Sequence, residues 1–203
     1  MRVELIPATL LLVAIASAAQ TWTTYVDLAD RFSANFPGEP DVEEISWDSE
    51  YGAVFSGRVH RYADGVESYS VTVIDYTESE RIHAQRANKT QADSLPNYWQ
   101  IDVLSSIAYA ARQYRQRAAE VTYDAWHYID LIAGHQLQLT NSDGTRSFVG
   151  IYLHESRLYI VEASVPANAP PPGLFQQSLT FLDAEGQRVR YNYIYTNQLP
   201  PLR

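Results

Sequence analysis

Two histidines and two aspartates between residues 124 and 135 form the densest group of potential metal ligands in the sequence. Imidazole nitrogens and carboxylate oxygens are common ligands of divalent metals in proteins. The group contains Asp124, His127, Asp130 and His135, and the candidate metal set is His127, Asp130 and His135. On a strand, however, Asp124 and Asp130 face away from His127, because successive side chains alternate between the two faces. The pattern favours exposed polar residues beside a hairpin.

The other histidines suggest a second kind of chemistry. His60 and His83 have no neighbouring acid–base partner in the sequence, and His154 precedes a predicted turn. A histidine pair and a serine from distant positions could still meet in space as a hydrolytic site. The sequence contains no P-loop, no Gly-rich dinucleotide fingerprint, no Gly-x-Ser-x-Gly elbow and no His-Glu-x-x-His helix. It also has no cysteine, which excludes a cysteine nucleophile. No catalytic residue and no cofactor is therefore indicated.

Tyrosine is unusually frequent, with 15 copies beside four tryptophans. Aromatic side chains with a polar edge are favoured at interfaces, although most of them should pack in the core or on a sheet face. Tyr191, Tyr193 and Tyr195 alternate with other residues near the C-terminus, so on a strand they would share one face. We take this trio as a candidate binding surface. A half-buried edge strand would show the same alternation.

Composition indicates one folded domain. The chain has 203 residues, 46% hydrophobic and 19% charged, which is typical of globular proteins. Its formal charge of −9 disfavours sequence-independent binding to nucleic acid. Without disulfides, the domain must depend on its apolar core for stability.

The first half of the chain predicts strands followed by helices. A strand with alternating Phe32, Ala34 and Phe36 ends at Pro37-Gly38, and the turn Ala63-Asp64-Gly65 joins two further strands as an antiparallel hairpin. Thr77-Glu78-Ser79-Glu80 has the form of a capping box and predicts a helical stretch, interrupted before Pro96, which can open a second helix. In that second helix the predicted apolar face consists of Ile101, Leu104, Ala108, Ala111 and Ala118.

The second half predicts an antiparallel meander followed by a helix and a last strand. The four predicted strands of the meander cover residues 121–132, 136–140, 147–153 and 158–165, with hairpin turns at 141–144 and 155–157. The spacing of Phe175, Ser178, Leu179 and Leu182 predicts a short amphipathic helix, which Gly186 would end. Residues 188–195 predict the tyrosine-rich strand. The whole pattern predicts an α+β fold, an antiparallel sheet flanked by helices.

The N-terminus has the features of an export signal. A positive start at Met1-Arg2 is followed by a nearly continuous apolar run over residues 5–16 and by the small-x-small triplet Ala16-Ser17-Ala18. Cleavage after Ala18 or after Ala19 fits equally well. The alternative is a membrane anchor, but the run is shorter than the roughly 20 residues that a spanning helix needs. We therefore expect a signal peptide over residues 1–19 and a single domain over residues 20–203, without stable membrane insertion after cleavage.

The order of these elements, together with the segments 32–40 and 175–179, resembles the PsbP-like superfamily, which includes the extrinsic photosystem subunit and the bacterial periplasmic DcrB-like proteins. The resemblance covers about residues 21–183. It implies an α/β/α sandwich and a non-catalytic role at the envelope or in the thylakoid lumen, and it supplies no catalytic residues. Residues 188–203 extend beyond it.

These observations lead to two functional hypotheses. The first is a periplasmic or secreted non-enzymatic domain that binds or supports another envelope component, with an envelope protein as the expected partner. The alternative is a secreted hydrolase or metal-binding enzyme whose site is assembled from distant residues, such as His127, Asp130 and His135.

Overall fold

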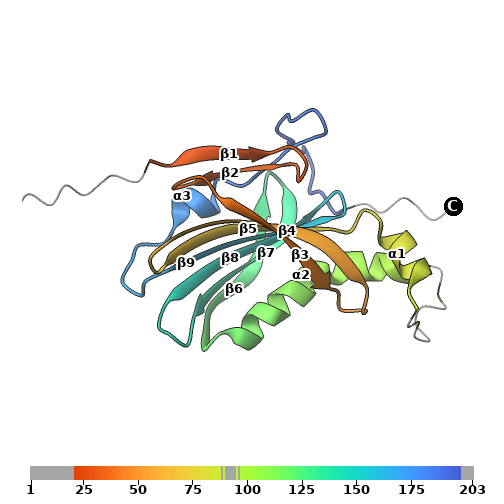
Figure 1. The fold of residues 1–203 in the computed structure, drawn as a ribbon, viewed down its shortest axis with the longest axis horizontal. Helices are drawn as coiled ribbons and strands as arrows, with labels where there is room; N and C mark the ends of the chain where they lie inside the picture. Colours follow the sequence, from red (N-terminus) through yellow and green to blue (C-terminus); the bar gives the residue numbers. More distant parts are fainter. Residues whose placement is uncertain (1–20, 88, 90–94, 96, 198–203) are drawn as a thin grey trace, which may run out of the picture.

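The computed structural model describes residues 21–87, 89, 95 and 97–197 as an α+β domain dominated by antiparallel strands. The predicted signal peptide, residues 1–19, lies outside the described residues. Two sheets and three helices make up the described part, and Figure 1 shows how they are layered.

The smaller sheet has three strands in the order β1-β2-β10. They are β1 (Thr23–Asp27), β2 (Phe32–Phe36) and β10 (Thr180–Phe181). The predicted alternation in β2 is confirmed, because Phe32, Ala34 and Phe36 are all buried and the residues between them are not. This sheet therefore presents one apolar face.

The larger sheet has seven strands in the order β3-β4-β5-β9-β8-β7-β6, all antiparallel. Its strands are β3 (Asp41–Asp48), β4 (Val54–Asp64), β5 (Glu67–Asp75), β6 (Glu120–Ile129), β7 (Ile132–Thr140), β8 (Arg146–His154) and β9 (Arg157–Val165). The predicted hairpin at residues 63–65 and the antiparallel C-terminal meander are confirmed. The strand predicted over residues 121–132 is too long, because β6 ends at Ile129 and Ile132 already belongs to β7. Pairing of β5 with β9 joins the two meanders into one sheet.

Each face of the large sheet has a different cover (Figure 1). The small sheet and α3 (Gly173–Gln176) pack on one face, where Phe36, Tyr159 and Phe175 belong to one core. Helix α2 (Tyr98–Arg117), next to α1 (Ser79–Gln85), packs on the other, where Val103 and Ile151 belong to a second core. The expected helix-flanked sheet is thus found on one side. On the other side the cover is mainly a small sheet, which corrects the predicted α/β/α sandwich.

The predicted apolar face of α2 is correct at Ala111 and wrong at Ile101 and Leu104. Ile101 and Leu104 are largely exposed, whereas the buried residues are Asp102, Val103, Ser106, Ala110 and Ala111. The buried side includes an aspartate and a serine because both have hydrogen-bond partners there: Asp102 accepts from the Ser49 hydroxyl, and the Ser106 hydroxyl donates to the Val103 carbonyl of the same helix. The spacing of apolar residues along a helix cannot identify a buried face that contains hydrogen-bonded polar residues.

The predicted capping box is also not formed. Helix α1 begins at Ser79 with no side-chain cap, and the Thr77 hydroxyl instead donates to the Asp75 carboxylate at 2.6 Å. Pro96, predicted to open the second helix, lies outside the described residues, and α2 begins at Tyr98.

Two C-terminal predictions are corrected. The predicted helix over residues 175–182 is only the single turn of α3, because Thr180 and Phe181 pair with β2 as β10. Its apolar residues are nevertheless buried, as the spacing indicated. Residues 188–195 form no strand; within this described segment, Arg188 and Tyr195 make isolated bridges to Leu182 and Ile132. Residues 188–197 are held by hydrogen bonds and an ion pair to hairpin turns, and not by pairing with a neighbouring strand.

The register of α2 can be tested with two adjacent substitutions. Val103→Ala should lower the free energy of unfolding by about 2 kcal/mol, because buried methyl groups are lost and a cavity remains. Leu104→Ala should lower it by less than about 0.5 kcal/mol, since Leu104 is already 54% exposed and loses little buried area. Urea denaturation measures both values. A larger loss for Leu104→Ala would contradict the observed register.

Candidate functional site

A groove of about 750 Å³ lies on the half of the large sheet that α2 leaves open. Residues of β3, β4, β5 and β9 line it on one side, and residues 113, 114, 116 and 117 at the C-terminal end of α2 line it on the other. Its volume is within the range typical of ligand sites. We refer to it as the sheet groove.

Strand register explains how the sheet groove is lined. Arg61 on β4 pairs with Ser70 on β5, which pairs with Glu162 on β9, so these three side chains form one row across the sheet. Two residues further along, Val59, Thr72 and Ile160 form the next row. The character of the groove therefore changes along the strands, from charged and hydroxyl-bearing to apolar.

Glu162 accepts hydrogen bonds from three side chains at the sheet groove. Its carboxylate accepts hydrogen bonds from the Tyr114 hydroxyl at 2.8 Å, from Ser147 at 3.3 Å and from the Arg117 guanidinium. Arg117 also lies 3.9 Å from the centroid of the Tyr114 ring, a cation–π distance. Burial is the largest cause of a raised pKa at Tyr114, so its hydroxyl stays protonated and donates. The Arg117 and Glu162 charges therefore compensate one another.

Arg61 differs from Arg117, because its guanidinium has no hydrogen bond or ion pair with any other residue that the structure describes. It lies on the rim shared with an adjoining hollow of about 360 Å³, whose lining combines hydroxyl groups of β5, β9 and the β7–β8 hairpin with the Asp143 carboxylate. The sheet groove thus has one uncompensated positive charge among its lining residues.

The predicted metal set is not brought together. His135 lies against Asp124, whose carboxylate is already bound by Arg115 through two hydrogen bonds of 2.6 and 2.9 Å. Arg115 is the first cause of the low pKa of Asp124, about 2. His127 points to the opposite face, where its Nδ1 is 2.9 Å from the Tyr152 hydroxyl.

Asp130, the remaining member, occupies the β6–β7 turn and forms a bidentate ion pair with Arg188. The three predicted ligands therefore lie in three different environments. Strand alternation, noted from the sequence, accounts for the separation of His127 from Asp124.

A serine, a histidine and an aspartate from distant positions do meet beneath α2. The Ser49 hydroxyl donates to Oδ2 of Asp102 at 2.6 Å, and Nε2 of His83 lies 2.8 Å from the same oxygen. A hydrolytic triad requires the serine to bond the histidine, with the aspartate behind it. Here the aspartate stands between the two, and all three are buried. This cluster fastens both helices to the loop before β4; it does not activate a nucleophile.

A second cluster gathers ligand-type atoms of Asp27, Asp30 and His60, all within 4.8 Å of one another. Nε2 of His60 is 2.7 Å from Asp30, and the Arg58 guanidinium is 2.6 Å from Asp30 and 3.6 Å from Asp27. Hydrogen bonds from His60 and Arg58 outweigh burial and lower the pKa of Asp30. The guanidinium already supplies the positive charge that a metal ion would bring, so this cluster holds β1 against β4.

The tyrosine trio divides into two partly buried members and one exposed member. Tyr191 and Tyr195 stack with ring centroids 4.7 Å apart, and the Tyr191 hydroxyl is 2.8 Å from Nε2 of the buried His154. Tyr193 is 84% exposed. The three residues therefore do not share one face, because the predicted strand is absent.

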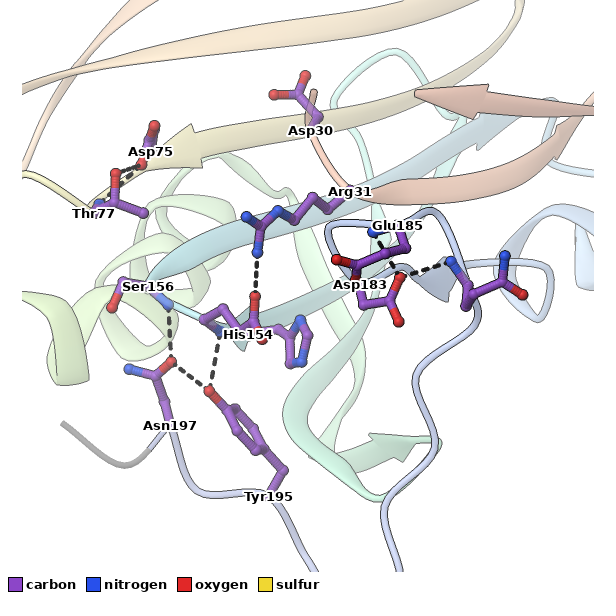
Figure 2. Close-up of polar contacts among 12 residues, drawn as sticks. Asp30, Arg31, Asp75, Thr77, His154, Ser156, Asp183, Glu185, Tyr195 and Asn197 are labelled. Atoms are coloured by element: carbon purple, nitrogen blue, oxygen red, sulfur yellow. Dashed lines mark hydrogen bonds and ion pairs between the residues drawn. The ribbon is translucent and has the colours of Figure 1, made fainter. Parts of the chain in front are cut away.

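The C-terminal segment 188–197 is held on two hairpin turns, and Figure 2 shows its contacts with the β8–β9 turn. The Glu155 amide donates to the Tyr195 hydroxyl at 3.1 Å, and the Ser156 amide donates to the Asn197 side chain at 2.9 Å. Beside them Arg31 forms an ion pair with Glu155 at 2.6 Å.

The residues of the sheet groove were not singled out from the sequence as a site. The available signal was the polar face of β5, where Ser68, Ser70 and Thr72 alternate with the buried Tyr69, Val71 and Val73. That pattern indicates a sheet with one solvated face, but not which strands lie on either side of it.

No family model matches the sequence, and no curated protein matches it. Among solved structures, the chain is similar to the solution structure of cyanobacterial PsbP from Synechocystis sp. PCC 6803, with 14% sequence identity and a TM-score of 0.37. The alignment covers 76% of this chain and 85% of that chain. A likeness at this level does not assign the chain to a family, so membership of the PsbP-like superfamily stays a prediction.

Within the described part of the chain, no helix combines the length and apolarity needed to cross a membrane.

His154 makes the stability of the domain dependent on pH. Burial lowers the pKa of His154 to about 4, against about 6.5 for an exposed histidine. Between these values the unfolded chain binds a proton that the folded chain excludes, so the free energy of unfolding falls as the pH falls. From pH 7 to pH 5 this site should contribute a loss of about 2 kcal/mol.

Urea denaturation at the two pH values measures this loss, with His154→Gln as the comparison, since glutamine does not titrate. The variant should lose less stability than the wild type between pH 7 and pH 5. Equal losses in the two proteins, or an NMR titration showing His154 protonated at pH 5, would refute the assignment.

Proposed function

We propose that this protein is an exported, non-enzymatic domain that binds another component of the cell envelope in the sheet groove. The groove is the observation that carries the proposal: about 750 Å³ of open concavity, with an apolar end, a hydroxyl-bearing floor and an unpaired Arg61. Export is supported by the N-terminal pattern of residues 1–19.

A binding role fits the chemistry of the sheet groove better than catalysis. Its carboxylate, Glu162, is fixed by three donors, and none of its lining residues is a histidine. The three histidine–aspartate contacts of the described residues, at Asp102, Asp30 and Asp124, lie outside the sheet groove. The hydrolase alternative therefore has no observation in its favour among the described residues.

The exposed Tyr193 is the member of the tyrosine trio that we retain as a candidate contact for a partner protein. Its ring is available, whereas Tyr191 and Tyr195 are occupied by His154 and by the β8–β9 turn. It lies on the C-terminal segment and is not among the residues lining the sheet groove.

Site-specific photo-crosslinking in intact cells of the source organism tests the binding proposal. A photoreactive amino acid at Gln116, an exposed residue on the rim of the sheet groove, should give a crosslinked product. The matched control is the same amino acid at Leu174, which is exposed on α3 over the opposite face. Products of equal yield at both positions, or none from a well-expressed Gln116 variant, would count against the groove as the binding site.

Export is tested separately by the mass of the mature protein. Protein recovered from the extracytoplasmic fraction should lack the first 18 or 19 residues, as expected for cleavage after Ala18 or Ala19. A full-length mass in the cytoplasmic fraction would overturn this part of the proposal.

A further inference from the structure

The sheet groove has a polarity that runs along its length. At one end Ile45, Trp47 and Val59 combine with the buried Ile160 to give an apolar floor and wall. At the other end lie Arg61 and the row of Ser70 and Glu162. Arg61 is four residues along β4 from Gly57, the partner of Ile45, which separates the two ends by about 13 Å at the rise of a β-strand.

The charges identify what the polar end can accept. Arg117 is compensated by Glu162, and the remaining lining charge is the single guanidinium of Arg61. The lining therefore carries one net positive charge on a chain whose formal charge is −9. One exposed guanidinium matches one carboxylate in charge and in bidentate geometry. Asp41, the neighbour of Arg61 on β3, makes no ion pair with it.

We propose that the sheet groove binds an amphipathic monocarboxylate, with the carboxylate at Arg61 and a medium-length acyl chain along Val59, Ile160 and Ile45. This inference rests on the proposed function, because it assigns a ligand class to the same groove. The apolar end removes the chain from water, which is favourable in proportion to the buried area. The adjoining hollow, lined by hydroxyl groups and by the Asp143 carboxylate, keeps the head group hydrated.

The groove fits a ligand with one negative charge and an apolar chain better than it fits a sugar, a phosphate or a nucleic acid. A neutral sugar would leave the Arg61 charge unused, and a phosphate dianion would meet only one uncompensated cation among the lining residues. A nucleic acid is opposed by the net charge of the chain.

Isothermal titration calorimetry with decanoate tests the proposal on the mature chain. Decanol, decyltrimethylammonium and acetate serve as probes that lack the negative charge, reverse it or lack the chain. Decanoate should bind most tightly, decanol about tenfold more weakly, and the other two not measurably. Equal binding of decanoate and decyltrimethylammonium, or no binding of decanoate, would overturn the ligand class.

Substitutions locate the ligand in the groove. Arg61→Gln should weaken decanoate binding about tenfold and leave decanol binding unchanged, and Arg61→Lys should restore part of the loss. Val59→Asn should weaken both ligands alike. Arg81→Gln, at an exposed arginine of α1 outside the sheet groove, is the matched control and should have no effect. Melting temperatures confirm that each variant is folded.

The two proposals fail in distinguishable ways. A groove-specific crosslink from Gln116 without decanoate binding would leave the binding role intact and refute the ligand class. Decanoate binding that Arg61→Gln and Val59→Asn both leave unchanged would place the ligand outside the groove and refute the inference.

Discussion

The burial of both faces of the central strands is the constraint on which the rest of the structure depends. Every residue of β8 after Arg146 is buried, and β9 is nearly as enclosed. A strand of this kind needs a cover on each side, because its apolar side chains point both ways. The small sheet, with Phe32, Phe36 and Phe175, supplies one cover, and α2 supplies the other. In a chain without disulfides, these two cores are the main source of stability.

The sheet groove follows from the widths of these layers. Seven strands spaced about 4.8 Å apart span roughly 30 Å, whereas one helix with its side chains is only about 10–12 Å across. Helix α2 packs on β7 and β8, so the same face of β3, β4 and β5 stays open. The sequence of β5 agrees with this division: Ile74 is buried near the helices, and Ser68, Ser70 and Thr72 face the groove. A ligand can bind on this open face, beside the C-terminal end of α2, without disturbing the packing of either core.

Strand alternation and turn residues were sufficient to predict most strands, including β2 and the meander from β6 to β9, because those signals are local. The register of α2 was not predictable in this way. Its buried face contains Asp102, whose partners Ser49 and His83 are distant in sequence. The sheet groove was missed for a related reason, since Arg61, Ser70 and Glu162 become neighbours only through the pairing of β4 with β5 and of β5 with β9. Long-range pairing of this kind leaves no local pattern. The predicted metal ligands His127, Asp130 and His135 are close in the sequence, but the structure places their side chains apart.

The C-terminal segment 188–197 stabilises the fold because it contacts two hairpin turns whose backbone conformation is energetically unfavourable. Asp130, Leu131, Glu155 and Ser156 form two turns with positive φ at both central residues, where glycine or asparagine is usual. A non-glycine residue with positive φ destabilises the folded state by about 1 kcal/mol or more. Segment 188–197 contacts all four: Arg188 binds Asp130, the Tyr195 amide donates to the Leu131 carbonyl, and Tyr195 and Asn197 accept from the Glu155 and Ser156 amides. The buried His154 between the turns adds a contact to Tyr191. Residues beyond the predicted PsbP-like region thus stabilise strained turns within it, and the tyrosines Tyr191 and Tyr195 serve this intramolecular role.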